Sequence, residues 1–264
     1  MVNASITRPD AKHRLAHLVD DLARHVDYLR EEGITEVDRS PAITPESPPA
    51  ISRKSSPVPT IPPTPSVSDA DISAELKAIA QTVSACKKCA LHEKRRQAVP
   101  GQGNVHPDIL FIGEGPGEDE DKQGLAFIGR AGKLLTRLIT RMGYTRDEVF
   151  IANIVKCRPP NNRKPLPDEM ATCFPYLKAQ IAVLKPKVIV ALGATAVETL
   201  VSPLARISRT RGIWQTFGDI PLMPTYHPSY LLRNQSAMWD VWNDMQLVLK
   251  RLGRTPPPVA AKDK

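Results

Sequence analysis

The stretch Ile109-Leu-Phe-Ile-Gly-Glu-Gly-Pro-Gly117 decides the fold, because a short apolar run ends there in a glycine-rich turn. Four consecutive apolar residues bounded by turn residues are typical of a strand buried in a sheet. Similar apolar runs follow at Val149–Ile154, Val188–Leu192 and Ile220–Met223. The sequence therefore predicts four strands.

Amphipathic segments with helical spacing lie between and after these runs. They cover Lys133–Met142, Asp168–Leu184, Ala194–Leu200 and Ala237–Leu252. Strands that alternate with helices favour a parallel sheet covered by helices on both faces. We therefore expect an α/β protein, a three-layer sandwich whose central, mainly parallel sheet has four strands.

Unusual polar segments follow three of the predicted strands. They are Gly113–Asp121, Asn153 with the loop around Cys157, and His227-Pro-Ser-Tyr230. In parallel sheets, ligands bind outside the carboxyl ends of the strands. We expect these segments to converge at one edge of the sheet and to form a site there.

The first of these segments resembles a phosphate-binding loop only in its glycines. It lacks the Lys-Ser/Thr pair of a P-loop, and it carries five carboxylates that would repel a phosphate: Glu114, Glu118, Asp119, Glu120 and Asp121. Its glycines and Pro116 favour close approach of the backbone to a flat ligand, with a carboxylate placed to orient a water. The other interpretation is an acidic turn that caps the next helix.

All four cysteines of the chain fit one metal centre. Cys86 and Cys89 form a C-x-x-C pair, and Cys157 and Cys173 are separated by fifteen residues that include four prolines. A structural zinc site usually takes two short pairs on tight turns. An iron–sulfur cluster fits ligands from distinct elements better.

Three alternatives for the cysteines stay open at this point: a zinc site, buried free thiols and disulfides. The N-terminus lacks the apolar segment of a secretory signal peptide. We therefore expect a reduced, cytoplasmic protein without disulfides and without a membrane association.

The 264 residues divide into a folded domain and flanking segments. Residues 1–39 contain one amphipathic stretch, Ala11–Glu32; residues 40–70 are a Pro/Ser-rich linker predicted to be disordered; residues 71–253 form the domain; and residues 254–264 form a tail predicted to be disordered. Residues 1–70 hold eight basic and ten acidic side chains, a net charge of −2, so residues 71–264 carry a net charge of +10. A basic domain favours a polyanionic partner.

Five motifs together resemble the family 4 uracil-DNA glycosylases, which are the iron–sulfur type. The motifs are Cys86-x-x-Cys89, Gly113-Glu-Gly-Pro-Gly-Glu-Asp-Glu-Asp121, Ala126-Phe-Ile-Gly-Arg-Ala-Gly132, Asn153-Ile-Val-Lys-Cys-Arg-Pro-Pro-Asn-Asn-Arg163 and His227-Pro-Ser-Tyr-Leu-Leu-Arg-Asn234. The resemblance spans about residues 75–252. It implies one 4Fe-4S cluster on the four cysteines and hydrolysis of the N-glycosidic bond of deoxyuridine in single- or double-stranded DNA.

The resemblance also implies a role for each matching residue. Phe127 matches the family's aromatic residue that stacks on uracil. Asn153 matches the residue whose side-chain amide pairs with N3–H and O4 of uracil, and His227 matches the residue that donates a hydrogen bond to O2. A fixed amide excludes cytosine, which presents the reversed donor and acceptor. Glu114 is a candidate for positioning the attacking water, Glu120 is a second candidate, and Gly115 and Pro116 bring the backbone to the base.

Further residues are predicted to contact DNA. The resemblance places Pro228 and Ser229 in a loop pressed into DNA, with phosphate contacts from Lys156, Arg158, Arg163, Arg209, Arg211, Arg233 and Asn234. We expect a monomer whose N-terminal helix has a possible protein partner. The loop Ile207–Gly212 lacks the histidine of a related enzyme that traps its product covalently. The alternative function is a non-catalytic iron–sulfur module that binds DNA beside replication or repair proteins.

Overall fold

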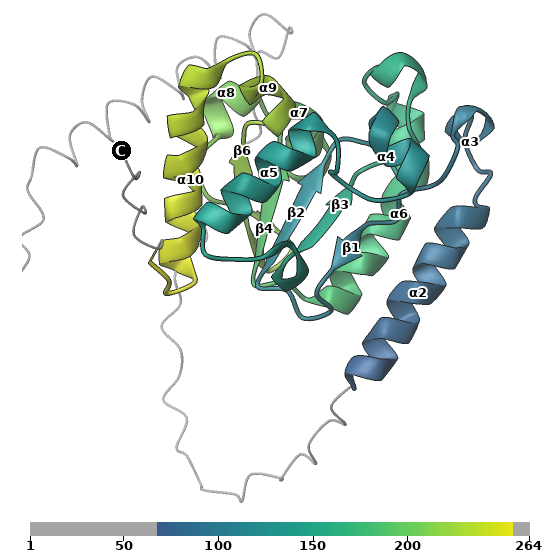
Figure 1. The fold of residues 1–264 in the computed structure, drawn as a ribbon, viewed down its shortest axis with the longest axis horizontal. Coiled ribbons are helices and arrows are strands. Elements are labelled where there is room, and N and C mark those ends of the chain that lie inside the picture. Colours follow the sequence, from purple (N-terminus) through teal and green to yellow (C-terminus); the bar gives the residue numbers. More distant parts are fainter. Residues whose placement is uncertain (1–67, 256–264) are drawn as a thin grey trace, which may run out of the picture. The chain divides into compact units, whose positions relative to one another are not determined.

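A computed structural model describes residues 68–255, which contain the predicted domain (Figure 1). The amphipathic stretch Ala11–Glu32, the linker up to residue 67 and the tail from residue 256 lie outside the described residues. Helix α2 begins at Asp69, so the domain boundary expected at residue 70 falls within its first turn. No helix among residues 68–255 is long and apolar enough to cross a membrane. The cytoplasmic location stays a prediction.

A six-stranded sheet forms the centre of the domain, with strand order β1-β3-β2-β4-β6-β5. The strands are β1 (Gln102–Gly103), β2 (Ile109–Gly113), β3 (Phe150–Asn153), β4 (Val188–Leu192), β5 (Gln215–Phe217) and β6 (Ile220–Thr225). The four predicted strands pair in parallel in the register Leu110 with Phe150, Leu110 with Ile189 and Ile189 with Leu222. The antiparallel edge strands β1 and β5 were not predicted.

Helices cover both faces of the sheet, which confirms the predicted three-layer sandwich (Figure 1). The α-helices are α2 (Asp69–Ala85), α3 (Leu91–Lys94), α4 (Glu118–Gln123), α5 (Arg130–Arg141), α6 (Pro167–Leu184), α7 (Ala194–Leu200), α8 (Ile207–Thr210), α9 (Pro228–Leu231) and α10 (Met238–Arg251). Short 3₁₀ turns are η1 (Arg146–Glu148), η2 (Pro160–Asn162) and η3 (Gln235–Ala237). Helix α2, which contacts α6, was not predicted from the sequence.

Alternate residues of β2 point into different layers, because side chains along a strand face opposite sides of the sheet. Ile109 and Phe111 join the core beneath α5 and α10. Leu110 and Ile112 join the core beneath α6 and α7. All four side chains are fully buried, so β2 is anchored from both sides and presents the loop after Gly113 from a fixed position.

The acidic segment after β2 divides into a turn and a helix. Gly113 ends β2, residues 114–117 form the turn that follows it, and Glu118–Asp121 form the first turn of α4. Carboxylates in a first helical turn interact favourably with the helix dipole. The interpretation as an acidic helix start is therefore correct for Glu118–Asp121, while Glu114 stays in the turn.

Candidate active site

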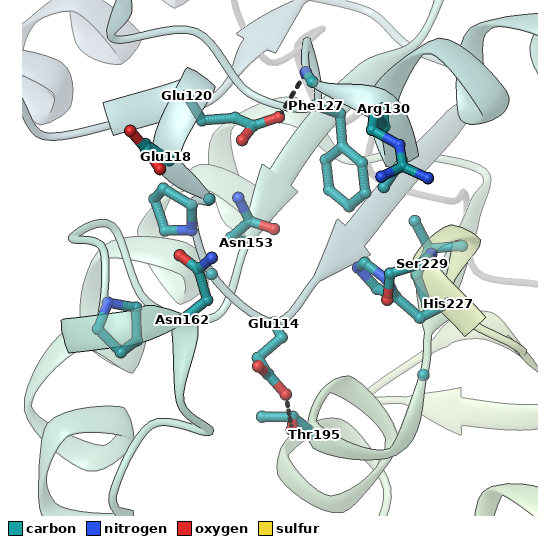
Figure 2. Close-up of a pocket in the computed structure, with 18 of the residues that line it drawn as sticks. Glu114, Glu118, Glu120, Phe127, Arg130, Asn153, Asn162, Thr195, His227 and Ser229 are labelled. Carbon is teal, nitrogen blue, oxygen red and sulfur yellow. Dashed lines mark hydrogen bonds between the residues drawn. The ribbon is translucent and has the colours of Figure 1, made fainter. Parts of the chain in front are cut away.

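A cleft of about 770 Å³ lies at the carboxyl ends of the parallel strands (Figure 2). Glu114 follows β2, Asn153 ends β3, Gly193 follows β4 and His227 follows β6. The polar segments therefore converge as the sequence predicted, and they do so because all four strands run in the same direction.

Asn153 lies at the base of the cleft with an unused hydrogen-bonding group. The side chain is 1% exposed, and its Oδ1 is the one buried side-chain N or O atom of residues 68–255 that has no hydrogen-bond partner. A buried polar atom without a partner costs about 1–3 kcal/mol. The side chain therefore fits a ligand that supplies the missing donor.

Gly113 leaves room for the side chains around Asn153. A Cβ atom at this position would lie 2.4 Å from Cζ of Phe127 and 2.6 Å from Oδ1 of Asn153. Both distances are far below van der Waals contact. The absence of a side chain at Gly113 thus allows the aromatic ring and the amide to line the same part of the cleft.

Phe127 and His227 form an aromatic pair in the cleft. Their ring centroids are 5.5 Å apart and the ring planes are inclined by 38°. Phe127 is 5% exposed. Figure 2 shows that Asn153, Phe127 and His227 surround a common space.

The tautomer of His227 follows from its hydrogen bonds. The backbone N–H of Ser229 donates to Nδ1 at 3.1 Å, and Ser229 Oγ lies 2.7 Å from the same atom. Nδ1 accepts and so carries no proton, which places the hydrogen of the neutral ring on Nε2. Burial, and then the charge of Arg233, lower the pKa of His227 to about 4. The residue is therefore a neutral Nε2–H donor at pH 7.

Glu114 is held by a residue that the sequence analysis missed. Thr195, buried in the first turn of α7, donates from Oγ1 to Oε2 of Glu114 (Figure 2). No hydrogen bond to the other carboxylate oxygen, Oε1, occurs within residues 68–255. Thr195 follows the carboxyl end of β4, so the rule that identified the other segments could also have identified this one.

Glu120, the second candidate for positioning the attacking water, holds backbone groups of the cleft. Its Oε1 accepts from the backbone N–H of Ile128 at 2.9 Å and of Gly129 at 2.8 Å. The side chain is 9% exposed. One oxygen of the carboxylate thus binds the segment that carries Phe127.

A neutral amide at position 120 preserves this arrangement. We expect Glu120→Gln to keep the single-turnover rate of the reaction catalysed in the cleft within about threefold of the wild-type rate. The side-chain oxygen of glutamine can accept the same two backbone hydrogen bonds from Ile128 and Gly129. A general base would lose at least about a hundredfold on this change. Single-turnover rates of the two proteins test this expectation. A loss of about a hundredfold or more would indicate that Glu120 acts as a general base.

Lys156 is buried and so is not accessible to DNA in this conformation, contrary to the sequence prediction. It is 1% exposed, and its Nζ donates to Oε1 of Gln180 at 2.7 Å. Burial lowers the pKa of this lysine to about 8. The chain turns inward after β3, so Lys156 fixes the loop against α6.

The other predicted DNA contacts differ in accessibility. Arg163, Ser229 and Arg233 line the cleft. Pro228 is buried and so is not accessible to DNA in this conformation, which corrects its predicted contact. The DNA roles of the remaining four residues stay predictions. Arg158 lies 3.6 Å from Glu118, and Arg211 donates hydrogen bonds to Asp244 and to the carbonyl of Asp240. Arg209 is exposed, and Asn234 is the N-cap of η3.

The four cysteines line a second, small cavity, although they come from three separate parts of the domain. Cys86 and Cys89 follow α2, Cys157 follows β3 and Cys173 lies in α6. Arg95 Nη1 donates to Sγ of Cys157 at 2.9 Å, and the N–H of Lys156 lies 3.2 Å from Sγ of Cys173. Within residues 68–255, no three His, Cys, Asp or Glu side chains are grouped as ligands of a single metal ion.

Comparison with known proteins agrees with this geometry. Residues 100–246 match the family model of the Uracil DNA glycosylase superfamily. The chain is 49% identical to a type-4 uracil-DNA glycosylase of Thermotoga maritima over 61% of its own length and 85% of the relative. It is 43% and 44% identical to type-4 enzymes of Sulfurisphaera tokodaii and Saccharolobus solfataricus, over 69% of this chain and 86% and 88% of theirs. The chain belongs to the type-4 uracil-DNA glycosylases of this superfamily.

Proposed function

We propose that the cleft binds a uracil that has been rotated out of DNA and that the protein hydrolyses its N-glycosidic bond, leaving an abasic site for repair. The observation that carries this proposal is the buried Oδ1 of Asn153, which has no hydrogen-bond partner among the described residues 68–255. Uracil N3–H supplies the missing donor, and the amide N–H₂ can donate to O4. A target base must leave the duplex stack before it can reach such a buried atom.

Three side chains divide the recognition of the base. Phe127 offers its ring as a stacking face, Asn153 reads N3–H and O4, and the Nε2–H of His227 donates to O2. Cytosine has an acceptor at N3 and a donor amino group at C4. It would therefore leave both the oxygen and the N–H₂ group of the Asn153 amide without a hydrogen-bond partner. This arrangement supports selectivity for uracil over the normal base.

The reaction requires stabilisation of two developing charges. As the bond between N1 and C1′ breaks, its electron pair leaves with the uracil and positive charge develops on the sugar. The neutral His227 donor stabilises the negative charge at O2, since a preorganised hydrogen bond is worth most where charge develops. Glu114, oriented by Thr195, holds a water for attack on C1′, and the proton of that water passes to the carboxylate or to solvent.

We further propose that Cys86, Cys89, Cys157 and Cys173 hold one 4Fe-4S cluster. Their placement around one cavity and the N–H donors aimed at two of the sulfurs suit thiolate ligands of a cluster. Cys86 and Cys89 after α2, Cys157 after β3 and Cys173 in α6 would hold such a cluster, which would supply a structural link between these three segments. The monomeric state, and a protein partner for residues 1–39, stay predictions.

The cluster has a visible signature. Anaerobically prepared protein should be brown and contain about four irons and four acid-labile sulfides per chain. Cys157→Ser should lose most of this absorbance and lower the melting temperature, because the loop then loses one ligand. Colourless protein that contains zinc would contradict the proposal.

The activity itself is tested on an oligonucleotide with a single uracil. Alkaline treatment should break the strand at the uracil after incubation with the protein, with a chelator of divalent metals present. Strands with cytosine or thymine at that position should stay intact. Tight binding of the uracil strand without breakage would favour the non-catalytic DNA-binding module.

A further inference from the structure

The segment that carries Phe127 has an unfavourable backbone conformation. Phe127 has φ +51°, in the left-handed region that costs an L residue about 1–2 kcal/mol. The first turn of α5 packs directly on it, since a Cβ at Gly132 would lie 1.9 Å from the carbonyl carbon and oxygen of Phe127. Other interactions must hold the segment in place.

Two side chains of opposite charge bind the polar groups of this segment. Glu120 accepts the N–H groups of Ile128 and Gly129, as described above. Arg146 donates from Nη2 to the carbonyl of Ala126 at 2.7 Å and from Nη1 to the carbonyl of Phe127 at 2.9 Å. Donors and acceptors on both sides of Phe127 are therefore satisfied by ionised groups, whose hydrogen bonds are stronger than neutral ones.

Arg146 is itself fixed and does not line the cleft. Its Nη1 also donates to Oγ1 of Thr136 at 3.0 Å, and Thr136 donates to the carbonyl of Gly132 at 3.0 Å. The side chain is half-buried in η1. It therefore acts on the cleft through the segment rather than through the substrate.

We propose that Arg146 is a positioning residue for uracil excision: opposite Glu120, it holds Phe127 in the left-handed conformation that keeps its ring in the cleft beside His227. Without Arg146, the carbonyls of Ala126 and Phe127 lose their charged partner. The segment can then relax toward ordinary negative φ, and the ring leaves the place of the stacked base. The inference rests on the proposed stacking role of Phe127.

A double-mutant cycle tests the inference, because it measures whether two residues act through each other. The variants are Arg146→Met, Phe127→Ala and the pair, assayed for kcat/KM on a uracil oligonucleotide. Arg137→Met is the matched control, since Arg137 lies exposed on α5 and does not line the cleft. Arg146→Lys tests rescue by a shorter cation.

We expect Arg146→Met to lower kcat/KM by about tenfold or more in the wild-type background and by less than about twofold in the Phe127→Ala background. Arg146→Lys should recover part of the loss, because an ammonium can donate to the same carbonyls. Arg137→Met should leave the activity unchanged.

Two results would overturn the inference while leaving the proposed function intact. Equal losses from Arg146→Met in both backgrounds would show that the arginine acts independently of Phe127, as a merely structural residue would. Full activity of Arg146→Met in the wild-type background would show that Phe127 does not need the arginine to hold its position. If Arg146→Met fails to fold, the neutral variant Arg146→Gln takes its place in the cycle and is judged by the same criteria. Full activity of Phe127→Ala would overturn the proposed stacking role of Phe127 and, with it, the inference about Arg146. That result would therefore be distinguished from a failure of the inference alone.

Discussion

Replacing His227 by alanine should lower the single-turnover rate of uracil release by about 10²–10³-fold, the loss typical of removing one preorganised donor to a developing anion. The Nε2–H is the donor removed, and the backbone N–H of Ser229 in α9 also loses Nδ1 as its acceptor. His106→Ala is a matched control, because that histidine lies on the surface beside Asp69.

The size of this loss should not change between pH 6 and pH 8. The pKa of His227 is lowered to about 4, so the ring stays neutral throughout this range. In the unfolded chain the ring protonates near pH 6.5, so His227 makes the protein less stable as pH falls from about 6.5 toward 4. A loss of less than about tenfold, or one confined to acidic pH, would contradict the role of a neutral donor.

Asn153→Ala should lower kcat/KM for uracil by about 10²–10³-fold. The variant leaves both N3–H and O4 of the base unpaired in a buried site, and each unpaired group costs about 1–3 kcal/mol. The melting temperature should change little or rise, because Oδ1 of Asn153 has no partner to lose within residues 68–255.

Asn243→Ala provides the control for this substitution, since Asn243 is exposed on α10. It should retain wild-type activity and stability. If Asn153→Ala kept full uracil release, the base would be recognised elsewhere in the cleft, and the assignment of the site would fail.

The four parallel strands could be predicted from the sequence because each is a buried apolar run. Val188–Leu192 is a strand with the predicted bounds, and all five of its residues are buried. Strands β1 and β5 have two and three residues and no buried ones, so they carry no such signal. Helix α2 was missed because only Ile72 and Val83 of its seventeen residues are buried.

The candidate site shows a similar division. The positions of Asn153 and His227 could be predicted because Asn153 ends β3 and His227 lies two residues after β6, where the topology determines their position. The roles of Lys156 and Glu120 could not, because a charged side chain in a sequence looks the same whether it faces solvent or binds a buried partner. Thr195 and Arg146 bind residues that lie far away in the sequence, and only the folded chain brings these contacts together.

The amount of free uracil released from a uracil-containing strand tests the central claim most directly. Wild-type protein should release uracil in an amount equal to the abasic sites formed, from the uracil strand and not from a matched cytosine strand. Binding of the uracil strand without free uracil in solution would contradict the account, since the cleft would then recognise the base without breaking its bond to the sugar.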